Sequence, residues 1–394
     1  MTLGYPQTVL SPRRRRRSLR ARAMGRDSLL RRFDWVLFVA ALGLSVAGAV
    51  FVYSATRVVP AGEDPQAYLK RHLLNLLIGL LLGFATMLFD YRTLRAYAPF
   101  VYIASVIGLI AVLVIGTEVN GAQAWIQVPG GFSIQPSEFM KVALAVGLAM
   151  LLAERRDGES EPQLPDVAFA LLIAAVPIGL VMLQPDLGTA VVMGMIVLGI
   201  LAVAGTRLWW LVALLALGVA GAYLAVQIGV LDQYQIDRLL AFANPELDPQ
   251  GVGYNTNQAR ITVGAGSIFG AGLFQGTQTA GGFVPEQQTD FIYTVVAEEL
   301  GFVGSIGIIA LFAVVLWRAL RIAVRAEDLF GTLMATGIVC WFAFQMFQNI
   351  GMVIGIMPVT GVPLPFVSYG GTSMFANWMA IGLLENVHLR RAIR

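Results

Sequence analysis

The 394-residue sequence has little charge, two histidines and a single cysteine, and each of these scarcities narrows the class of protein. Charged residues make up 13% of the chain, whereas about 25% is typical of soluble globular domains. Cys340 has no second cysteine with which to form an intramolecular disulfide, and it lies within an apolar run. One cysteine with His72 and His388 cannot supply the Cys and His ligands of a zinc site. The composition therefore argues against a soluble domain, a disulfide scaffold and a zinc protein.

Long apolar runs fill most of the chain instead. Hydrophobic residues make up 57% of it, and the mean hydropathy is +0.72. The runs are about 17–25 residues long, enough to cross about 30 Å of hydrocarbon as helices, and they are continuous rather than alternating, which excludes a β-barrel. We therefore expect an all-α polytopic membrane protein with about ten transmembrane helices. The predicted spans are residues 35–53, 72–89, 99–116, 136–153, 167–183, 187–204, 207–230, 289–317, 331–356 and 370–388.

Residues 1–32 differ from the rest of the chain because they hold ten arginines, five of them in the run from Arg13 to Arg17. We predict a disordered basic cytoplasmic tail that lies near anionic lipid, and no nucleic-acid partner. No small-residue cleavage site follows the first apolar segment, so we expect an uncleaved span rather than a signal peptide. Residues 33–390 are expected to form a single membrane domain.

The distribution of Lys and Arg predicts the orientation of the spans, because cytoplasmic loops are enriched in these residues. With the N-terminus inside, the inner segments hold 21 of the 27 Lys and Arg residues, and the outer segments hold five. Both termini are therefore expected to be cytoplasmic. Residues 231–288 are predicted to form one long extracytoplasmic loop with a short surface helix at residues 257–268. Long ordered loops are often functional.

Polar residues gather at the outer ends of the predicted spans. In QPSEFMK, residues 135–141, Pro136 suits the first turn of a helix, and Glu138 and Lys141 are i, i+3 neighbours that can pair. The pair is either an internal salt bridge or a lysine that is aimed at an anionic ligand and held by Glu138. Asp186, in the turn between the fifth and sixth spans, is either a helix N-cap or a site residue.

Trp125 and a segment rich in proline and glycine also lie on the outer side. Trp125, in the 117–135 loop, is either a membrane-interface residue or part of a site. Residues 361–373, GVPLPFVSYGGTS, cannot form a regular helix. Irregular backbone at membrane depth is tolerated where it is buried in protein or lines a watery cavity, so we predict a re-entrant loop. Ser368 and the backbone N–H groups near Gly370 and Gly371 are its candidate donors.

The carboxylates of residues 281–301, GGFVPEQQTDFIYTVVAEELG, are of two kinds. Asp290 lies at the start of the eighth span, where it either caps the helix or takes part in chemistry. Glu298 follows eight residues later, about 12 Å deeper at 1.5 Å per residue. Glu298 and Glu299 are expected to hydrogen-bond neighbouring helices or to be protonated. Asp290 is therefore the preferred candidate for chemistry.

Several long motifs occur in an order that matches a known family. They are QPSEFMK at 135–141, QPDLGTA at 184–190, PEQQTDFIYTVVAEELG at 285–301 and PLPFVSYGGTS at 363–373, together with GYNTNQARITVGAGSIFGA at 253–271. The chain resembles the SEDS family (shape, elongation, division and sporulation) on these motifs, and within it the RodA type, with FtsW as a close alternative. The resemblance covers residues 33–390, and the arginine-rich tail lies outside it.

The resemblance implies a peptidoglycan glycosyltransferase that polymerises lipid II on the outer side of the bacterial cytoplasmic (inner) membrane. It also implies a partner, a class B penicillin-binding protein that crosslinks the strands. The essential aspartate of the family maps onto Asp290, and its other important positions map onto Trp125, Glu138, Lys141, Asp186 and Ser368. A divalent cation, Mg²⁺ or Mn²⁺, is expected from the family's habit and the acidic residues, since no metal-ligand spacing is visible in the sequence.

These positions receive the following predicted roles. Asp290 is the general base for the acceptor 4-hydroxyl, or a ligand of the cation. Lys141 stabilises the charge that develops on the pyrophosphate. The predicted substrate-binding residues are Lys141, Glu138, Trp125, Asp186, Ser368, Gly370 and Gly371.

Two other functions remain open. A lipid II flippase would also suit ten spans with intramembrane charge, but it should have charged residues near the midplane and usually an internal repeat. Here the polar motifs lie on one side, and no convincing repeat is found. A scaffold that only recruits the penicillin-binding protein would not need Asp290, Lys141 and Ser368 to converge. The sequence does not firmly separate elongation, division and sporulation types, and the 253–290 loop favours elongation.

Overall fold

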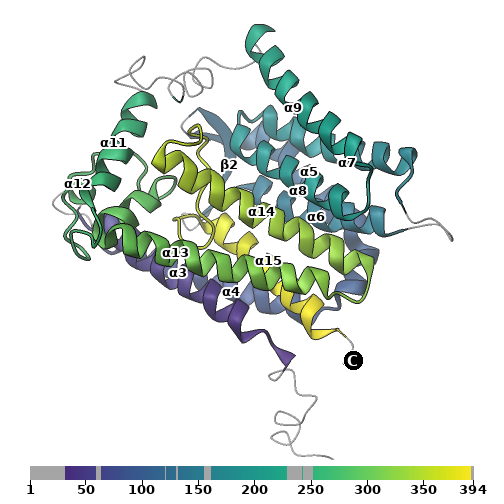
Figure 1. Cartoon of the computed structure of the whole chain (residues 1–394), viewed down its shortest axis with the longest axis horizontal. Helices are drawn as coiled ribbons and strands as arrows, with labels where there is room; N and C mark the ends of the chain where they lie inside the picture. Colours follow the sequence, from purple (N-terminus) through teal and green to yellow (C-terminus); the bar gives the residue numbers. More distant parts are fainter. Residues whose placement is uncertain are drawn as a thin grey trace, which may run out of the picture.

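Ten long helices dominate the part of the chain that is described by this computed structural model (Figure 1). The structure describes residues 32–58, 64–119, 121–129, 132–154, 161–228, 242 and 252–391. The long helices are α3 (Trp35–Thr56), α4 (Ala67–Leu88), α5 (Tyr91–Ile115), α6 (Pro136–Ala153), α7 (Leu164–Met182), α8 (Leu187–Val203), α9 (Leu208–Ile228), α13 (Ile292–Val324), α14 (Leu329–Ile354) and α15 (Gly371–Leu389). The predictions for the basic tail and for most of residues 229–251 lie outside the described residues.

Each predicted span coincides with one of these helices, which confirms the polytopic helical class. Seven of the described helices are long and apolar enough to cross a membrane, and α8 and α9 contain shorter apolar stretches. The remaining helix, α15, carries buried Ser373, Asn377, Glu385 and Asn386. Other helices surround α15, so these polar groups face protein rather than lipid. This position explains how a helix with these polar side chains can serve as the last predicted span.

The first and the last of these helices meet at one end of the bundle. The backbone N–H of Asp34 donates to Glu385 Oε2 (3.1 Å), so the start of α3 lies beside the end of α15 (Figure 1). We call this end the terminal end. The opposite end, which we call the loop end, carries α11 (Val252–Ala265), α12 (Thr277–Gly281) and a short sheet. The two ends of the described membrane domain thus lie at the same end of the bundle, as the prediction for both termini requires.

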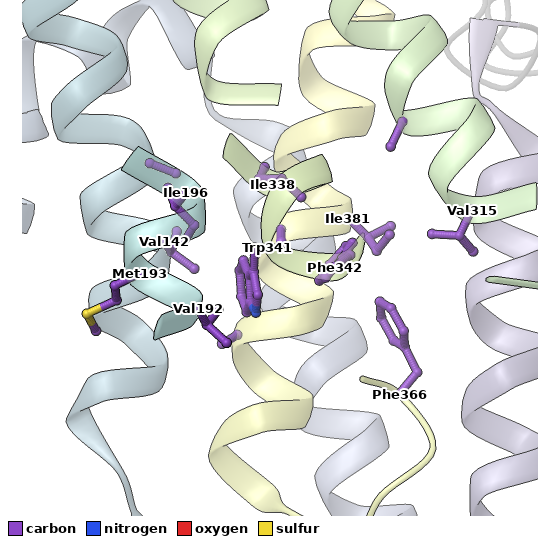
Figure 2. Packing of buried hydrophobic residues seen from close by; sticks show 14 of the residues in the cluster. Val142, Val192, Met193, Ile196, Val315, Ile338, Trp341, Phe342, Phe366 and Ile381 are labelled. Atoms are coloured by element: carbon purple, nitrogen blue, oxygen red, sulfur yellow. The ribbon is translucent and has the colours of Figure 1, made fainter. Parts of the chain in front are cut away.

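The core of the bundle lies around α14 and α15. α15 packs along α4 and also contacts α6, while α14 packs against α6, α8 and α13. Figure 2 shows side chains from these helices around Trp341 and Phe342, with Phe366 reaching in from a loop. By contrast, α9 lies at the margin against α8 and exposes apolar side chains such as Trp209 and Leu217. A single core thus holds the central helices, and α9 is peripheral.

The loop between α5 and α6 forms a small antiparallel sheet that the sequence analysis did not predict. Its strands are β1 (Thr117–Val119), β2 (Ala122–Val128) and β3 (Phe132–Ile134), with β2 in the middle. Thr117 pairs with Trp125, and Ile126 pairs with Ile134. β1 and β3 have only three residues each, which is too short to give a recognisable alternation in the sequence. The membrane domain is helical as expected, and the sheet is an addition at the loop end.

The eighth predicted span, 289–317, is longer and less regular than expected. α13 continues to Val324, and it is interrupted at Gly301, which has φ 65° and ψ −162°. Glycine tolerates this positive φ because it has no Cβ. The predicted surface helix at residues 257–268 corresponds to α11, which begins and ends a few residues earlier. The sequence analysis treated residues 289–317 as one continuous span and did not predict the break at Gly301.

Residues 355–370 return into the bundle without forming a helix, which confirms the predicted irregular loop. Phe366, at φ 65°, is buried with its ring against Phe342 and Trp378. A Cβ added to Gly48, in the middle of α3, would lie 2.6 Å from Val367 O. The loop therefore reaches the interior of the bundle, and Gly48 permits this close approach.

Candidate functional site

A cavity of about 210 Å³ lies at the loop end of the bundle. Its walls come from β2, the start of α6, the turns that precede α8 and α13, and the loop between α14 and α15. The polar and aromatic lining residues are Trp125, Gln135, Glu138, Asp186, Thr189, Glu286, Thr289, Asp290, Thr360, Tyr369 and Ser373. Five segments, which come from four separate stretches of the sequence (122–138, 185–189, 286–290 and 360–373), therefore converge on one cavity.

Five of the eight predicted site residues line this cavity, namely Trp125, Glu138, Asp186, Asp290 and Gly370. The other three do not line it. Lys141 and Ser368 are only 1% and 5% exposed, and each is enclosed by protein. Gly371 faces α4, where a Cβ added to it would lie 3.3 Å from the Asn75 amide. The predicted convergence is therefore present for Asp290 and Asp186, whereas Lys141 and Ser368 lie outside the lining.

Asp290 belongs to a turn that leads into α13. Its backbone N–H donates to Glu286 O (3.1 Å), and its backbone oxygen accepts from Asn349 Nδ2 of α14 (2.7 Å). The N-cap of α13 is Phe291, and the cap makes no side-chain hydrogen bond. Phe291, rather than Asp290, therefore occupies the N-cap position of α13. The backbone contacts hold Asp290 at the cavity wall.

Glu138 and Lys141 form the ion pair that their spacing predicts. Lys141 Nζ lies 2.8 Å from Glu138 Oε1, and both side chains are almost fully buried. Lys141 also donates to Gln345 Oε1 (3.1 Å) and lies over the Trp341 ring, 4.7 Å from its centroid. The functional prediction placed Lys141 against the ligand with Glu138 behind it, and the structure has the two residues the other way round. Glu138 lines the cavity, and Lys141 holds Glu138 from behind.

Asp186 combines the two roles that the sequence left open. Its Oδ1 accepts from Thr189 N (3.0 Å), which makes it the N-cap of α8. Its Oδ2 accepts from Gln135 Nε2 (3.2 Å), at the start of α6, and the residue lines the cavity. Trp125 lies on the middle strand of the sheet and also lines the cavity rather than facing lipid alone.

Ser368 shapes the re-entrant loop rather than the cavity surface. Its Oγ accepts from Leu364 N (2.8 Å), and the backbone N–H groups of Val367 and Ser368 both donate to Leu364 O. This compact turn presents the next two residues, Tyr369 and Gly370, to the cavity. Tyr369 N donates to Gln288 O (2.9 Å), so the loop is joined directly to the turn that carries Asp290.

Glu286 and Tyr369 are among the lining residues that the sequence analysis did not single out. Glu286 lies four residues before Asp290 at φ 51°, and its Oε2 accepts from Gln288 Nε2 and Thr289 Oγ1 (3.3 Å each). Tyr369 follows Ser368 within the predicted re-entrant loop. Both belong to motifs that the sequence analysis quoted. Glu286 could have been found from its position directly after Pro285, and Tyr369 from its aromatic ring beside Gly370.

Carboxylates dominate the charge of the cavity. Glu138, Asp186, Glu286 and Asp290 line it, and no Lys, Arg or His is among its described lining residues. Glu138 Oε2 is buried and has no hydrogen-bond partner in the described structure. These oxygen donors fit a hard cation, which commonly takes one or two carboxylates together with substrate phosphates. Within the described part of the chain, however, no three His, Cys, Asp or Glu side chains form a group that could hold a metal ion by themselves.

Comparison with known proteins supports the family resemblance. Residues 34–393 match the cell cycle protein family of FtsW, RodA and SpoVE. The chain is 40% identical to stage V sporulation protein E of Bacillus subtilis over 364 residues, which cover 90% of this chain and 96% of that protein. It is 38% identical to the probable peptidoglycan glycosyltransferase FtsW of Trichlorobacter lovleyi, over 91% of this chain and 93% of that protein. It is 36% identical to the peptidoglycan glycosyltransferase MrdB of Escherichia coli, over 87% of this chain and 91% of that protein.

Solved structures show the same fold. One is a chain from work on the structural coordination of polymerization and crosslinking by a peptidoglycan synthase complex. It matches with a TM-score of 0.76 and 32% identity, covering 90% of this chain and 97% of that one. The crystal structure of the rod shape determining protein RodA of Thermus thermophilus matches with a TM-score of 0.68 and 31% identity. The match covers 92% of this chain and 98% of that one. The chain therefore belongs to the SEDS family, the family of FtsW, RodA and SpoVE.

Proposed function

We propose that this protein is a peptidoglycan glycosyltransferase that polymerises lipid II into glycan strands. Two of the relatives, FtsW and MrdB, carry this activity in their names. The observation that carries the proposal is the convergence of five chain segments on one cavity that is lined by Asp290 and three further carboxylates. A scaffold that only recruits another protein has no need of such a cavity.

In the proposed reaction, the oxygen of the acceptor 4-hydroxyl attacks C1 of the donor sugar. The bond from C1 to the undecaprenyl pyrophosphate breaks, and the pyrophosphate leaves with the electron pair. Asp290 accepts the hydroxyl proton as general base, a contribution of about 10²–10⁴-fold. The contacts of its backbone with Glu286 and Asn349 keep the carboxylate in place for this step.

A divalent cation, Mg²⁺ or Mn²⁺, is part of the proposal. Asp290 and one of the other three cavity carboxylates would hold it, and water and pyrophosphate oxygens would complete its ligands. The bound cation would supply positive charge opposite the leaving pyrophosphate. The described lining has no Lys, Arg or His that could do so. Removal of divalent cations with a chelator should therefore abolish polymerisation, and added Mg²⁺ or Mn²⁺ should restore it.

Lys141 and Glu138 act together in the proposed site. Because Lys141 is enclosed by Glu138, Gln345 and Trp341, its proposed role is to fix the Glu138 carboxylate at the wall rather than to contact pyrophosphate. Trp125, Asp186 and Gly370 are proposed to contact the substrate. Ser368 and Gly371 are proposed to act through the shape of the re-entrant loop.

The loop end is proposed to face the extracytoplasmic side, because the positive charge of the chain lies on the other side of the predicted spans. The proposed partner is a class B penicillin-binding protein. This assignment is supported by the likeness to a chain of a peptidoglycan synthase complex in which polymerization and crosslinking are coordinated. Membrane lipids contact the exposed apolar faces of the helices. Elongation is the proposed process, on the resemblance of residues 253–290 to the RodA type.

Polymerisation of labelled lipid II by the purified protein tests the function. We expect glycan strands with wild type in the presence of a divalent cation and the partner transpeptidase, and none with Asp290→Asn. Translocation of lipid II across vesicles without any glycan product would support a flippase and sink the enzyme proposal. Rescue of cell shape after depletion of RodA, without rescue of division after depletion of FtsW, would support elongation.

A further inference from the structure

The break in α13 is filled by the loop that precedes this helix. Residues 267–272 replace the helical hydrogen bonds that are lost at Gly301. The four bonds run from Ala271 N to Glu298 O (2.9 Å), from Gly272 N to Glu299 O (3.0 Å), from Phe302 N to Ser267 O (3.0 Å) and from Val303 N to Ile268 O (3.1 Å). Backbone groups at membrane depth need such partners. The loop is therefore attached to α13 through its backbone.

The side chain of Glu298 extends this attachment. It is 1% exposed, and it accepts hydrogen bonds from Gln278 N (2.7 Å), Thr279 N (2.8 Å) and Thr279 Oγ1 (2.6 Å). These N–H groups open α12, whose N-cap, Gly276, has no side chain to accept them. A Cβ on Gly276 would lie 2.6 Å from Glu298 Oε2, so the glycine leaves room for this carboxylate. Glu298 thus caps a helix that lies some twenty residues earlier in the chain.

Thr279 connects this cap to the turn that carries Asp290. Thr279 O accepts from Gln287 Nε2 (3.0 Å), which also donates to Ala55 O of α3 (2.9 Å). Gln287 is buried and lies three residues before Asp290. The turn is therefore held between α12, α3 and the re-entrant loop, which bonds to Gln288 O. A continuous path of hydrogen bonds leads from Glu298 to the Asp290 turn.

We propose that Glu298 is a positioning residue for Asp290: its carboxylate holds α12 and, through Thr279 and Gln287, fixes the turn that presents Asp290 to the cavity. The inference rests on the proposed role of Asp290 in the reaction. Glu298 does not line the cavity, so it acts without touching substrate. A carboxylate suits the task because both of its oxygens accept, whereas an amide has only one acceptor oxygen. A displacement of about 1 Å at a reacting group can reduce turnover by about 10²-fold.

Glu298→Gln tests the proposal, with Glu385→Gln as the matched control. Glu385 is equally buried and also accepts a backbone N–H, that of Asp34, but it lies at the terminal end. We expect Glu298→Gln to lower kcat roughly 10- to 100-fold while KM for lipid II changes less than about twofold. Hydrogen exchange at residues 277–290 should become faster in the same variant. Glu385→Gln should leave kcat, KM and this exchange unchanged.

A second variant keeps the test decisive if Glu298→Gln folds poorly. Thr279→Val removes one of the three hydrogen bonds to Glu298 and should lower kcat by a smaller factor, about threefold to tenfold. The two changes break the same link, so the double variant should lose little more than Glu298→Gln alone.

Three results overturn the positioning role. They are faster exchange at 277–290 with unchanged kcat, a loss confined to KM, and multiplicative losses in the double variant. If Asp290 is not the general base, Asp290→Asn will turn over lipid II normally, and this result is distinct from the three above.

Discussion

At the loop end of the bundle, Glu138, Asp186, Glu286 and Asp290 line a cavity that has no Lys, Arg or His among its described lining residues. At the terminal end, Asp34 is buried, Arg318 Nε donates to its Oδ2 (2.8 Å), and its backbone N–H donates to Glu385. The terminal cluster joins α3, α13 and α15 and neutralises Asp34 within the protein. The loop-end cavity instead gathers four carboxylates around a space that a substrate or a cation can enter.

This difference separates two uses of carboxylates in a membrane protein: Asp34 is buried and paired, whereas Asp186 and Asp290 are partly buried and Glu286 is exposed at the cavity. A buried charge is costly unless it is paired, so pairing with a fixed arginine indicates a structural joint. Carboxylates at a cavity without a lining cation indicate a place where a ligand completes the charge balance. Glu138 lies between the two cases, because Lys141 neutralises one of its oxygens from behind and the other lacks a hydrogen-bond partner.

The largest expected effect is on chemistry at the loop end. Asp290→Asn should reduce polymerisation of labelled lipid II by at least about 10²-fold, because the amide cannot accept the hydroxyl proton. The thermal unfolding midpoint should stay close to that of wild type, since asparagine has nearly the size of aspartate and the backbone bonds to Glu286 and Asn349 are kept. A variant that polymerises normally would remove Asp290 from the reaction and weaken the contrast between the two ends.

Lys141→Met should have the largest effect on stability. It leaves Glu138 buried without its cation, which costs about 3–5 kcal/mol in the free energy of unfolding. The double variant Glu138→Gln with Lys141→Met should recover part of this loss, because no buried charge remains. Denaturant unfolding in detergent measures both values. A loss below about 1 kcal/mol in the single variant would mean that water reaches the pair, since exposed pairs contribute about that little.

Arg318→Met should destabilise the terminal cluster by about 2 kcal/mol, as expected for hydrogen bonds to a charged group. Arg321→Met is the control, because Arg318 and Arg321 both pack over the Trp317 ring and only Arg318 is shown to bond Asp34. The kcat and KM of the folded fraction should not change in either variant. Reduced kcat in folded Arg318→Met would show that the terminal end also affects chemistry.

The smallest expected effect is that of Ser368→Ala. Loss of the hydrogen bond from Leu364 N to Ser368 Oγ should cost about 1 kcal/mol, while the two backbone bonds to Leu364 O keep the turn. Polymerisation should fall by less than about tenfold, the factor that 1.4 kcal/mol represents. Ser105→Ala, which removes a hydroxyl bond to Val101 O within α5, is the stability control. A loss comparable to that of Asp290→Asn would mean that Ser368 contacts the substrate directly.

The positions of the ten helices and the main site candidates could be predicted from the sequence alone. Apolar runs of membrane length are local features, and so are the polar motifs that interrupt them. The spacing of Glu138 and Lys141 predicted their ion pair, and the prolines and glycines around Ser368 predicted the irregular loop. The expectation that Glu298 and Glu299 bond neighbouring segments was also correct, since Glu299 accepts from Ser54 of α3.

Other features were decided only by tertiary structure, because they depend on segments that are distant in the sequence. Spacing could not show which member of the Glu138–Lys141 pair faces the cavity, since Gln345 and Trp341 enclose the lysine from another helix. Hydropathy could not reveal the break at Gly301, because residues 267–272 supply the hydrogen bonds that make the break tolerable. The sequence by itself thus determined the helices and the polar residues at their ends. The packing of distant segments decided which of those residues meet at the cavity and which hold them in place.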